Sequence, residues 1–180
     1  MMSRRNFLKG AIATLCGSQL KNLQSAFAST DLESTKERVL KLYNIHTGER
    51  LHTCYQVGGK YIQDEVNRIN HFLRCHYTNV VKPISIQVID LLCEIKNCFA
   101  NDMEINIISG YRSPKYNNHL RSHGRQVAEG SLHLHGLAID FAISGIRTEK
   151  LAKAAIQFQA GGVGLYPEFV HIDVGKVRRW

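Results

Sequence analysis

The most informative segment of the sequence is residues 131–140, which read Ser-Leu-His-Leu-His-Gly-Leu-Ala-Ile-Asp. His133 falls in a loop, and Asp140 falls seven residues later on the alternating segment 138–143, which predicts a β-strand. Gly136 lets the chain bend between the two residues. The segment therefore brings a histidine and an aspartate to one strand of a predicted sheet.

The elements on both sides of this segment predict an α+β domain. Alternating apolar positions predict further strands over 38–45, 51–57, 105–109, 163–166 and 169–174, of which the first two form a hairpin. Apolar residues at helical spacing predict helices over 61–76 and 86–99, and shorter helices are expected over 114–123 and 148–159, the last one capped by Thr148. We expect a single domain with helices gathered on a central antiparallel sheet.

A second histidine and aspartate occur near the end of the sequence. His171 and Asp173 are two residues apart on the strand over 169–174, so their side chains project from one face. Two histidines and an aspartate suit Zn²⁺ and leave its fourth position open to water, as catalytic zinc sites do. His133, Asp140 and His171 are therefore candidate zinc ligands.

Other histidines offer competing ligands, because the chain has nine. His133 and His135 form an H-x-H pair, and His119 and His123 form an i, i+4 pair that could bind a metal if helical. We expect these alternatives to be solvated loop and helix residues, with His135 kept as a possible contact of the metal or the substrate.

The charge of the chain is concentrated at its start. The 180 residues include 23 Lys and Arg against 15 Asp and Glu, a formal charge of +8, and half of this charge lies in the first 28 residues, which hold no acid. A hydrophobic content of 44% excludes a disordered chain. The sequence shows no basic helix, aromatic platform or finger spacing that would indicate nucleic-acid binding, and no apolar run of the ~20 residues that a membrane helix needs.

The first residues have the layout of an export signal. Arg4 and Arg5 start a segment, 3–9, that resembles the twin-arginine export motif, and Ala26 and Ala28 form an A-x-A cleavage pattern. We expect a twin-arginine signal peptide over 1–28, a linker over 29–37 and the folded domain over 38–180. The expected partner in export is the twin-arginine machinery, and the expected location is the periplasm.

Cysteine usage gives no firm disulfide pattern. Cys16 leaves with the expected signal, and four cysteines remain: Cys54, Cys75, Cys93 and Cys98. Cys93 and Cys98 lie five residues apart in a predicted helix, so they point about 140° apart and should not pair. We expect no essential disulfide, with one optional bridge left open.

The spacing S-x-H-x-x-G-x-A-x-D, followed about 30 residues later by V-H-x-D, resembles the murein endopeptidase K family. These proteins are relatives of the D-alanyl-D-alanine carboxypeptidases and, more distantly, of the hedgehog domain. The resemblance also includes 46–49, 61–62, 70–72, 109–113, 161–164 and 169–175, and it ends with Arg178 and Trp180. It implies a hedgehog-like fold, a periplasmic zinc peptidase that cuts peptide cross-links of peptidoglycan, and His133, Asp140 and His171 as the metal ligands.

The resemblance leaves the catalytic base open. Asp173 is one candidate, although it could instead orient a ligand, and Glu168 is another, three residues before His171, although it could be a surface turn residue. The connection that holds Glu168 is about two residues shorter than in the family. Arg112 follows a strand, and the resemblance implies that it holds substrate or stabilises an oxyanion, with structural pairing as the alternative. Ser131 could orient the site through its hydroxyl or serve only in a turn.

The leading hypothesis is thus a zinc-dependent murein endopeptidase that acts on D,D- or L,D-type cross-links between stem peptides. The alternatives are a D-Ala carboxypeptidase of the same fold and a cell-wall-binding module in which zinc is only structural. We expect a monomer without membrane insertion.

Overall fold

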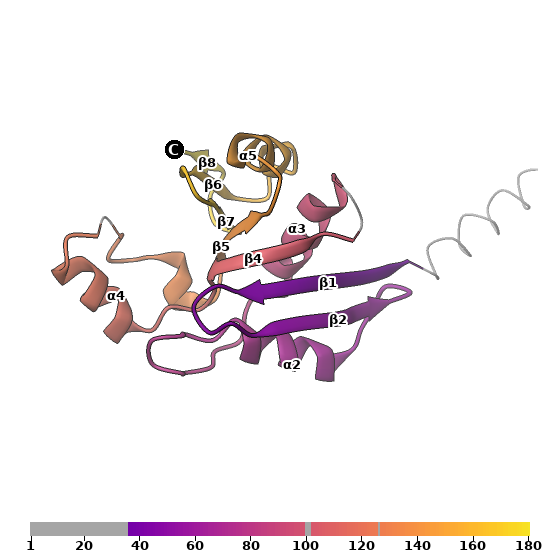
Figure 1. Cartoon of the computed structure of the whole chain (residues 1–180), viewed down its shortest axis with the longest axis horizontal. Helices are drawn as coiled ribbons and strands as arrows, with labels where there is room; N and C mark the ends of the chain where they lie inside the picture. The colour runs from indigo at the N-terminus through magenta and orange to yellow at the C-terminus, as the bar shows by residue number, and fades with distance from the viewer. Residues whose placement is uncertain (1–35, 100–101, 126) are drawn as a thin grey trace, which may run out of the picture.

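The computed structural model describes residues 36–99, 102–125 and 127–180 (Figure 1). The expected signal peptide over 1–28, most of the linker and Cys16 lie outside these residues. One mixed sheet of eight strands in the order β3-β2-β1-β4-β5-β7-β6-β8 runs through the described part. Its strands are β1 (Glu37–Asn44), β2 (Arg50–Val57), β3 (Lys60–Tyr61), β4 (Glu104–Ser109), β5 (Ala138–Ile143), β6 (Gly162–Leu165), β7 (Val170–Asp173) and β8 (Arg178–Arg179).

The prediction of an antiparallel sheet is wrong at two of its pairings. β1 pairs with β4 in parallel, and β6 pairs with β8 in parallel, whereas the other neighbouring strands are antiparallel. A parallel pair needs a long crossover, and the connection between β1 and β4 contains β2, β3 and two helices. Strands β3 and β8 were not predicted, because two residues are too short for an alternating pattern.

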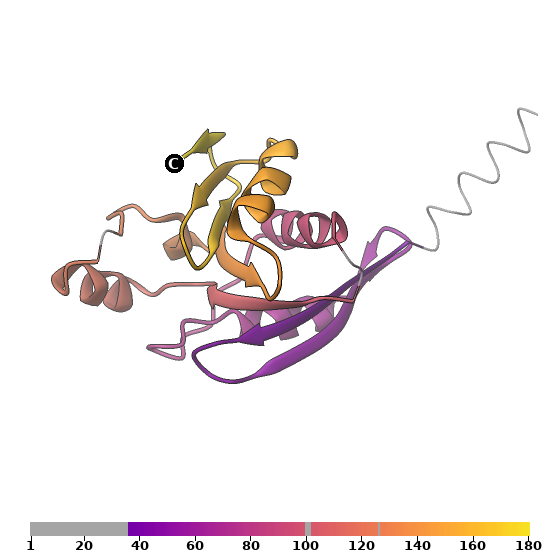
Figure 2. The same ribbon diagram turned by 45° about the horizontal axis from the view of Figure 1, so that its top comes forward.

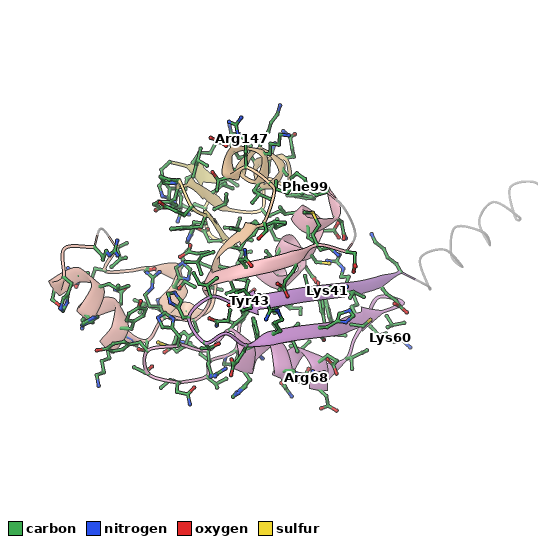
Figure 3. The ribbon with its side chains drawn as sticks, in the orientation of Figure 1. Lys41, Tyr43, Lys60, Arg68, Phe99 and Arg147 are labelled. Carbon is green, nitrogen blue, oxygen red and sulfur yellow. The ribbon has the colours of Figure 1, made fainter. Side chains whose placement is uncertain are left out.

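Three helices pack on the sheet and close the core. They are α2 (Gln63–Phe72), which contacts β2, α3 (Ile86–Asn97), which contacts β1 and β7, and α5 (Thr148–Gln157), which contacts β6 and β7 (Figure 2). Leu40 and Leu42 of β1 point into the core, and Lys41 and Tyr43, labelled in Figure 3, alternate with them. Thr148 does not cap α5 as predicted: it is the first helical residue, and Arg147 precedes it without a side-chain cap bond.

The helix α4 (Pro114–Ser122) stands to one side of the sheet, at the left of Figures 1 and 2. It begins where predicted because Pro114 fits the first helical turn and the Oγ of Ser113 accepts a hydrogen bond from the Tyr116 N–H at 3.2 Å. In the described part of the chain, the four cysteines are free thiols and no helix has the length and apolarity to cross a membrane.

Candidate metal centre

His133 lies on a short 3₁₀ helix, η1 (Leu132–His135), where the sequence predicted a loop. The Arg112 N–H donates to the His133 carbonyl at 3.1 Å and ties η1 to the end of β4. Gly136 ends η1 with φ +67°, and a Cβ there would lie 2.3 Å from the Pro83 carbonyl oxygen. His133 is consequently fixed in a buried position, with 2% of its surface exposed.

Asp140 and His171 come from neighbouring strands. Asp140 of β5 lies directly opposite His171 of β7 in the antiparallel register. Residues in such a pair have closely spaced side chains, and both of these side chains are buried. The two strands therefore hold an aspartate and a histidine together beside η1.

The three candidate ligands converge on one point. Within the described ranges, His133, Asp140 and His171 form a group of possible metal ligands whose ligand atoms all lie within 4.8 Å of one another. The His133 Nε2 is 3.2 Å from both the Asp140 Oδ1 and the His171 Nδ1, and the latter two atoms are 2.7 Å apart. Bonds of about 2.0–2.2 Å at tetrahedral angles would put ligand atoms about 3.3–3.6 Å apart, so small shifts would fit the group to Zn²⁺.

The outer nitrogens of both histidines already have hydrogen-bond partners. His133 Nδ1 lies 2.8 Å from the Gly110 carbonyl oxygen, which only accepts, so Nδ1 carries the proton and Nε2 presents its lone pair inward. His171 Nε2 lies 3.2 Å from the Asp173 Oδ2, which leaves Nδ1 on the inner side. Once the proton on His171 Nδ1 is lost, two nitrogen lone pairs and a carboxylate oxygen face one another, which is the kind of donor set that a borderline cation prefers.

The charges in the site support one another. Burial alone would raise the pKa of Asp140, but His133 and His171 outweigh burial and bring this pKa below its usual range. Burial would lower the pKa of His171, but the hydrogen bonds to Asp140 and Asp173 outweigh this effect and raise the pKa. In the absence of a metal ion, a proton on the inner Nδ1 of His171 therefore links this ring to the Asp140 carboxylate.

Asp173 is a fully engaged buried carboxylate. Its Oδ1 accepts from the N–H groups of Gly162 at 2.9 Å and Gly175 at 2.8 Å and from Arg178 at 3.2 Å, and its Oδ2 contacts Arg178 at 2.7 Å and His171 at 3.2 Å. Burial raises the pKa of Asp173, but these hydrogen bonds outweigh burial and lower the pKa. As predicted from their spacing, Asp173 and His171 lie on the same strand face, and the carboxylate contacts the ring on the side away from the candidate ligand atom.

Trp180 forms a wall beside His171, with ring centroids 5.3 Å apart. Its indole N–H donates to the Tyr166 hydroxyl at 2.9 Å, and the Arg178 guanidinium lies 4.8 Å from the centroid of its ring. A Cβ at Gly164 would lie 2.7 Å from the indole, so only glycine leaves room for the ring. The segment after β7 therefore runs back along β6 and places Trp180 beside the candidate centre.

Arg112 pairs with one of the candidate ligands, as the structural alternative for this residue expects. Its Nη2 is 3.4 Å from both the Asp140 Oδ2 and the Ser109 Oγ. Its buried Nε has no hydrogen-bond partner in the described part of the chain.

The structure does not bring Glu168 to the candidate ligands. Glu168 is exposed in the turn between β6 and β7, where it lines a hollow of about 380 Å³ with residues such as Ser144 and Arg147. Figure 3 labels Arg147 at the start of α5, away from α4. Glu168 therefore lies beside α5 and not beside η1.

The remaining candidates are placed as follows. Ser131 is buried before η1 and makes no side-chain cap bond, while His135 is exposed. His119 lies on α4 and His123 follows its last residue, with ring centroids 4.1 Å apart. The sequence indicates Arg178 and Trp180 only through the family resemblance, because a two-residue strand does not reveal which residues lie beside it in the sheet.

Comparisons with known proteins show the family of the chain. The family model Peptidase_M15_2, described as peptidoglycan L,D-endopeptidase MepK, matches residues 32–180. The peptidoglycan L,D-endopeptidase MepK of Escherichia coli (strain K12) is 42% identical over 157 residues, which cover 86% of this chain and 85% of that protein. The probable peptidoglycan L,D-endopeptidase MepK of Haemophilus influenzae is 34% identical over 181 residues, or 99% of this chain and 95% of that protein. No solved structure matches the chain significantly.

Proposed function

The chain is a peptidase of the murein endopeptidase K family, Peptidase_M15_2, and from this membership we propose that it hydrolyses L,D cross-links between peptidoglycan stem peptides in a zinc-dependent reaction. The substrate is the one that the names of its relatives give. The observation that carries the zinc assignment is the convergence of His133, Asp140 and His171, whose outer atoms are already hydrogen-bonded.

His133 Nε2, Asp140 Oδ1 and His171 Nδ1 would hold the ion. When bound, Zn²⁺ supplies an acidified water and polarises the scissile carbonyl. The Gly110 carbonyl keeps the His133 proton on Nδ1, so His133 turns a lone pair inward. Asp173 keeps a His171 proton on Nε2, so the inner Nδ1 of His171 is the nitrogen that would give up its proton to the ion. These contacts prepare the donor set before the ion arrives.

Arg112 is the residue proposed to stabilise charge on the substrate. Its guanidinium lies beside Asp140, is always protonated and has an unpartnered buried Nε–H. Donors fixed next to a carbonyl that becomes an oxyanion stabilise the transition state more than the ground state. Arg112 would therefore act on the rate more than on zinc affinity.

The two carboxylates have different proposed roles. Asp173 is occupied by Arg178, Gly162, Gly175 and His171, which supports a role in orienting His171. Glu168 is exposed in a separate hollow, which supports no direct role in the reaction.

The proposed location follows from the substrate and the leader. Peptidoglycan lies outside the cytoplasm, and the twin-arginine-like segment 3–9 would direct the chain there through the twin-arginine machinery, with removal of 1–28. We include a monomeric state in the proposal, because a single chain supplies all three candidate ligands.

The test is the digestion of purified L,D- and D,D-linked muropeptide dimers, with product analysis by mass spectrometry. We expect the L,D-linked dimer to fall to monomers, chelation to stop the reaction and added Zn²⁺ to restore it. Undiminished cleavage after complete zinc removal would contradict the metal mechanism. Release of only a terminal D-amino acid would indicate a carboxypeptidase, and binding to peptidoglycan without cleavage would indicate a wall-binding module.

A further inference from the structure

Aromatic rings from three separate segments form a continuous row beside α4. His46 stacks on His76 at 3.9 Å, the His76 ring meets Tyr116 edge-on at 4.8 Å, and the row continues through Tyr77, His119 and His123. These residues come from the β1–β2 turn, the loop after α2, and α4 with its cap. The sequence does not reveal the row, because its rings come from three segments that are far apart along the chain.

Tyr77 is the exposed tyrosine of this row, and His46 and His123 at the two ends of the row are exposed as well. It stacks on Tyr116 at 4.9 Å and 17° and on His119 at 4.9 Å and 20°. Both neighbours are partly buried, whereas 45% of Tyr77 is exposed. Since one face of the Tyr77 ring covers its neighbours, the opposite face is the one that solvent reaches.

The support under Tyr77 is fixed by hydrogen bonds. The loop closes on itself, because the Cys75 N–H donates to the Val80 carbonyl at 3.0 Å and the Asn79 N–H to the Cys75 carbonyl at 2.7 Å. The Cys75 thiol also lies 3.4 Å from the Ser113 Oγ that caps α4. A ring held in this way loses little side-chain entropy when a ligand stacks on it.

The row is neutral. Burial, and then the charges of His46 and Arg112, lower the pKa of His76 to about 4, so this imidazole is uncharged at neutral pH. A flat, neutral aromatic face with hydroxyl groups at its edge suits the apolar face of a sugar ring better than a polyanion.

Arg112 and Ser113 connect the row to the candidate metal centre along the chain. Arg112, whose guanidinium reaches Asp140, directly precedes the Ser113 cap of α4, and Tyr116 lies about one helical turn, ~5 Å, further on. A stem peptide is attached to the glycan strand, and the roughly three residues between its sugar and its cross-link span about 10 Å when extended. A cross-link at the metal centre would thus bring the attached sugar near Tyr77.

We propose that the open face of Tyr77, supported by Tyr116 and His119, stacks on a sugar ring of the glycan strand whose stem peptide is being cut. This subsite rests on the proposed function for its ligand. It would make the enzyme prefer cross-links still attached to glycan over free cross-linked peptides.

The test measures binding of the full chain to soluble glycan strands freed of stem peptides by an amidase, which contain nothing to cleave. Isothermal titration compares wild type, Tyr77→Ala, Tyr77→Trp and Tyr61→Ala. Tyr61 is a matched control because it is 44% exposed, but it lies on β3, which pairs with the end of β2 farthest from the β1–β2 turn. We expect Tyr77→Ala to weaken binding roughly three- to tenfold and the other two variants to bind like wild type.

Equal binding by wild type and Tyr77→Ala, or no binding by either, would overturn the proposal. Tighter, Tyr77-dependent binding of single-stranded DNA would also overturn it and assign the row to nucleic acid. Tyr77→Trp keeps a stacking face, so its retained binding separates loss of stacking from a misfolded loop. Cleavage that persists without Tyr77-dependent glycan binding would refute this subsite alone, and glycan binding through Tyr77 without cleavage of any dimer would refute the proposed function alone.

Discussion

The Nε2 of His171 lies 3.2 Å from the Oδ2 of the buried Asp173, on the side of the ring opposite to Nδ1. This contact decides which nitrogen of His171 is free for a metal ion. Arg178 and two backbone N–H groups fix the same carboxylate. Asp173 therefore contacts His171 from the side of the ring away from the candidate ligand atom.

Asp173→Asn should weaken zinc binding. The amide keeps the shape of the side chain but loses the charge that orients His171, and loss of such a partner typically costs 10- to 100-fold in metal affinity. Competition with a chromophoric chelator measures the affinity. Glu168→Gln is the matched control and should leave affinity and turnover within about twofold, because Glu168 lies in a separate hollow. If Asp173→Asn kept full zinc affinity and lost only turnover, Asp173 would be a base.

Arg112→Lys should lower kcat by about 10²- to 10³-fold while zinc affinity stays unchanged. Lysine keeps the charge but not the planar set of donors that reaches Asp140 and Ser109. Steady-state kinetics on an L,D-linked dimer, together with the zinc content of the variant, checks this prediction. A loss of zinc equal to the loss of activity would show that Arg112 serves the metal site and not the substrate.

Gly164→Ala should displace Trp180. The new methyl group would lie 2.7 Å from the indole, which sits beside His171, so the ring must move. Since the chain has one tryptophan, its fluorescence reports the movement directly. We expect a shifted emission maximum and a destabilisation of about 1–3 kcal/mol. An unchanged emission spectrum together with wild-type activity would contradict the displacement of Trp180.

The stability of the metal-free protein should depend on pH through His171. Its pKa is raised above the ordinary 6.5, so its proton stabilises the fold fully below pH 6.5, and this contribution is lost as the pH rises through the raised value. Zn²⁺ replaces the proton on Nδ1 and restores the lost contact. Thermal unfolding with and without zinc should therefore show a difference in Tm that widens from pH 6 to pH 8. A difference that narrows over this range would refute the assignment of Nδ1.

Local patterns predicted the elements that carry the candidate site. The strand over 138–143 occurs as predicted, and the two-residue spacing of His171 and Asp173 placed both on one face. The spacing could not reveal the parallel pairing of β1 with β4, because strand order depends on how distant segments pack. The helix predicted over 61–76 ends already at Phe72, since the Leu73 carbonyl accepts from the Tyr111 N–H.

The surroundings of the site depend on contacts between distant segments and so escaped prediction. Trp180 reaches His171 only because β8 adds to the edge of β6. The engagement of Asp173 by Arg178 likewise follows from the chain doubling back after β7. The engagement of Asp173 by Arg178 is what supports the proposed orienting role, and the sequence leaves this role open beside that of a base.

The most direct test of the zinc centre is X-ray absorption at the zinc edge of the active protein loaded with one equivalent of Zn²⁺. We predict two imidazole ligands together with oxygen at about 2.0–2.2 Å and no sulfur, and loss of one imidazole in His171→Ala. A sulfur ligand at about 2.3 Å, or an unchanged spectrum in His171→Ala, would contradict the assignment of His133, Asp140 and His171.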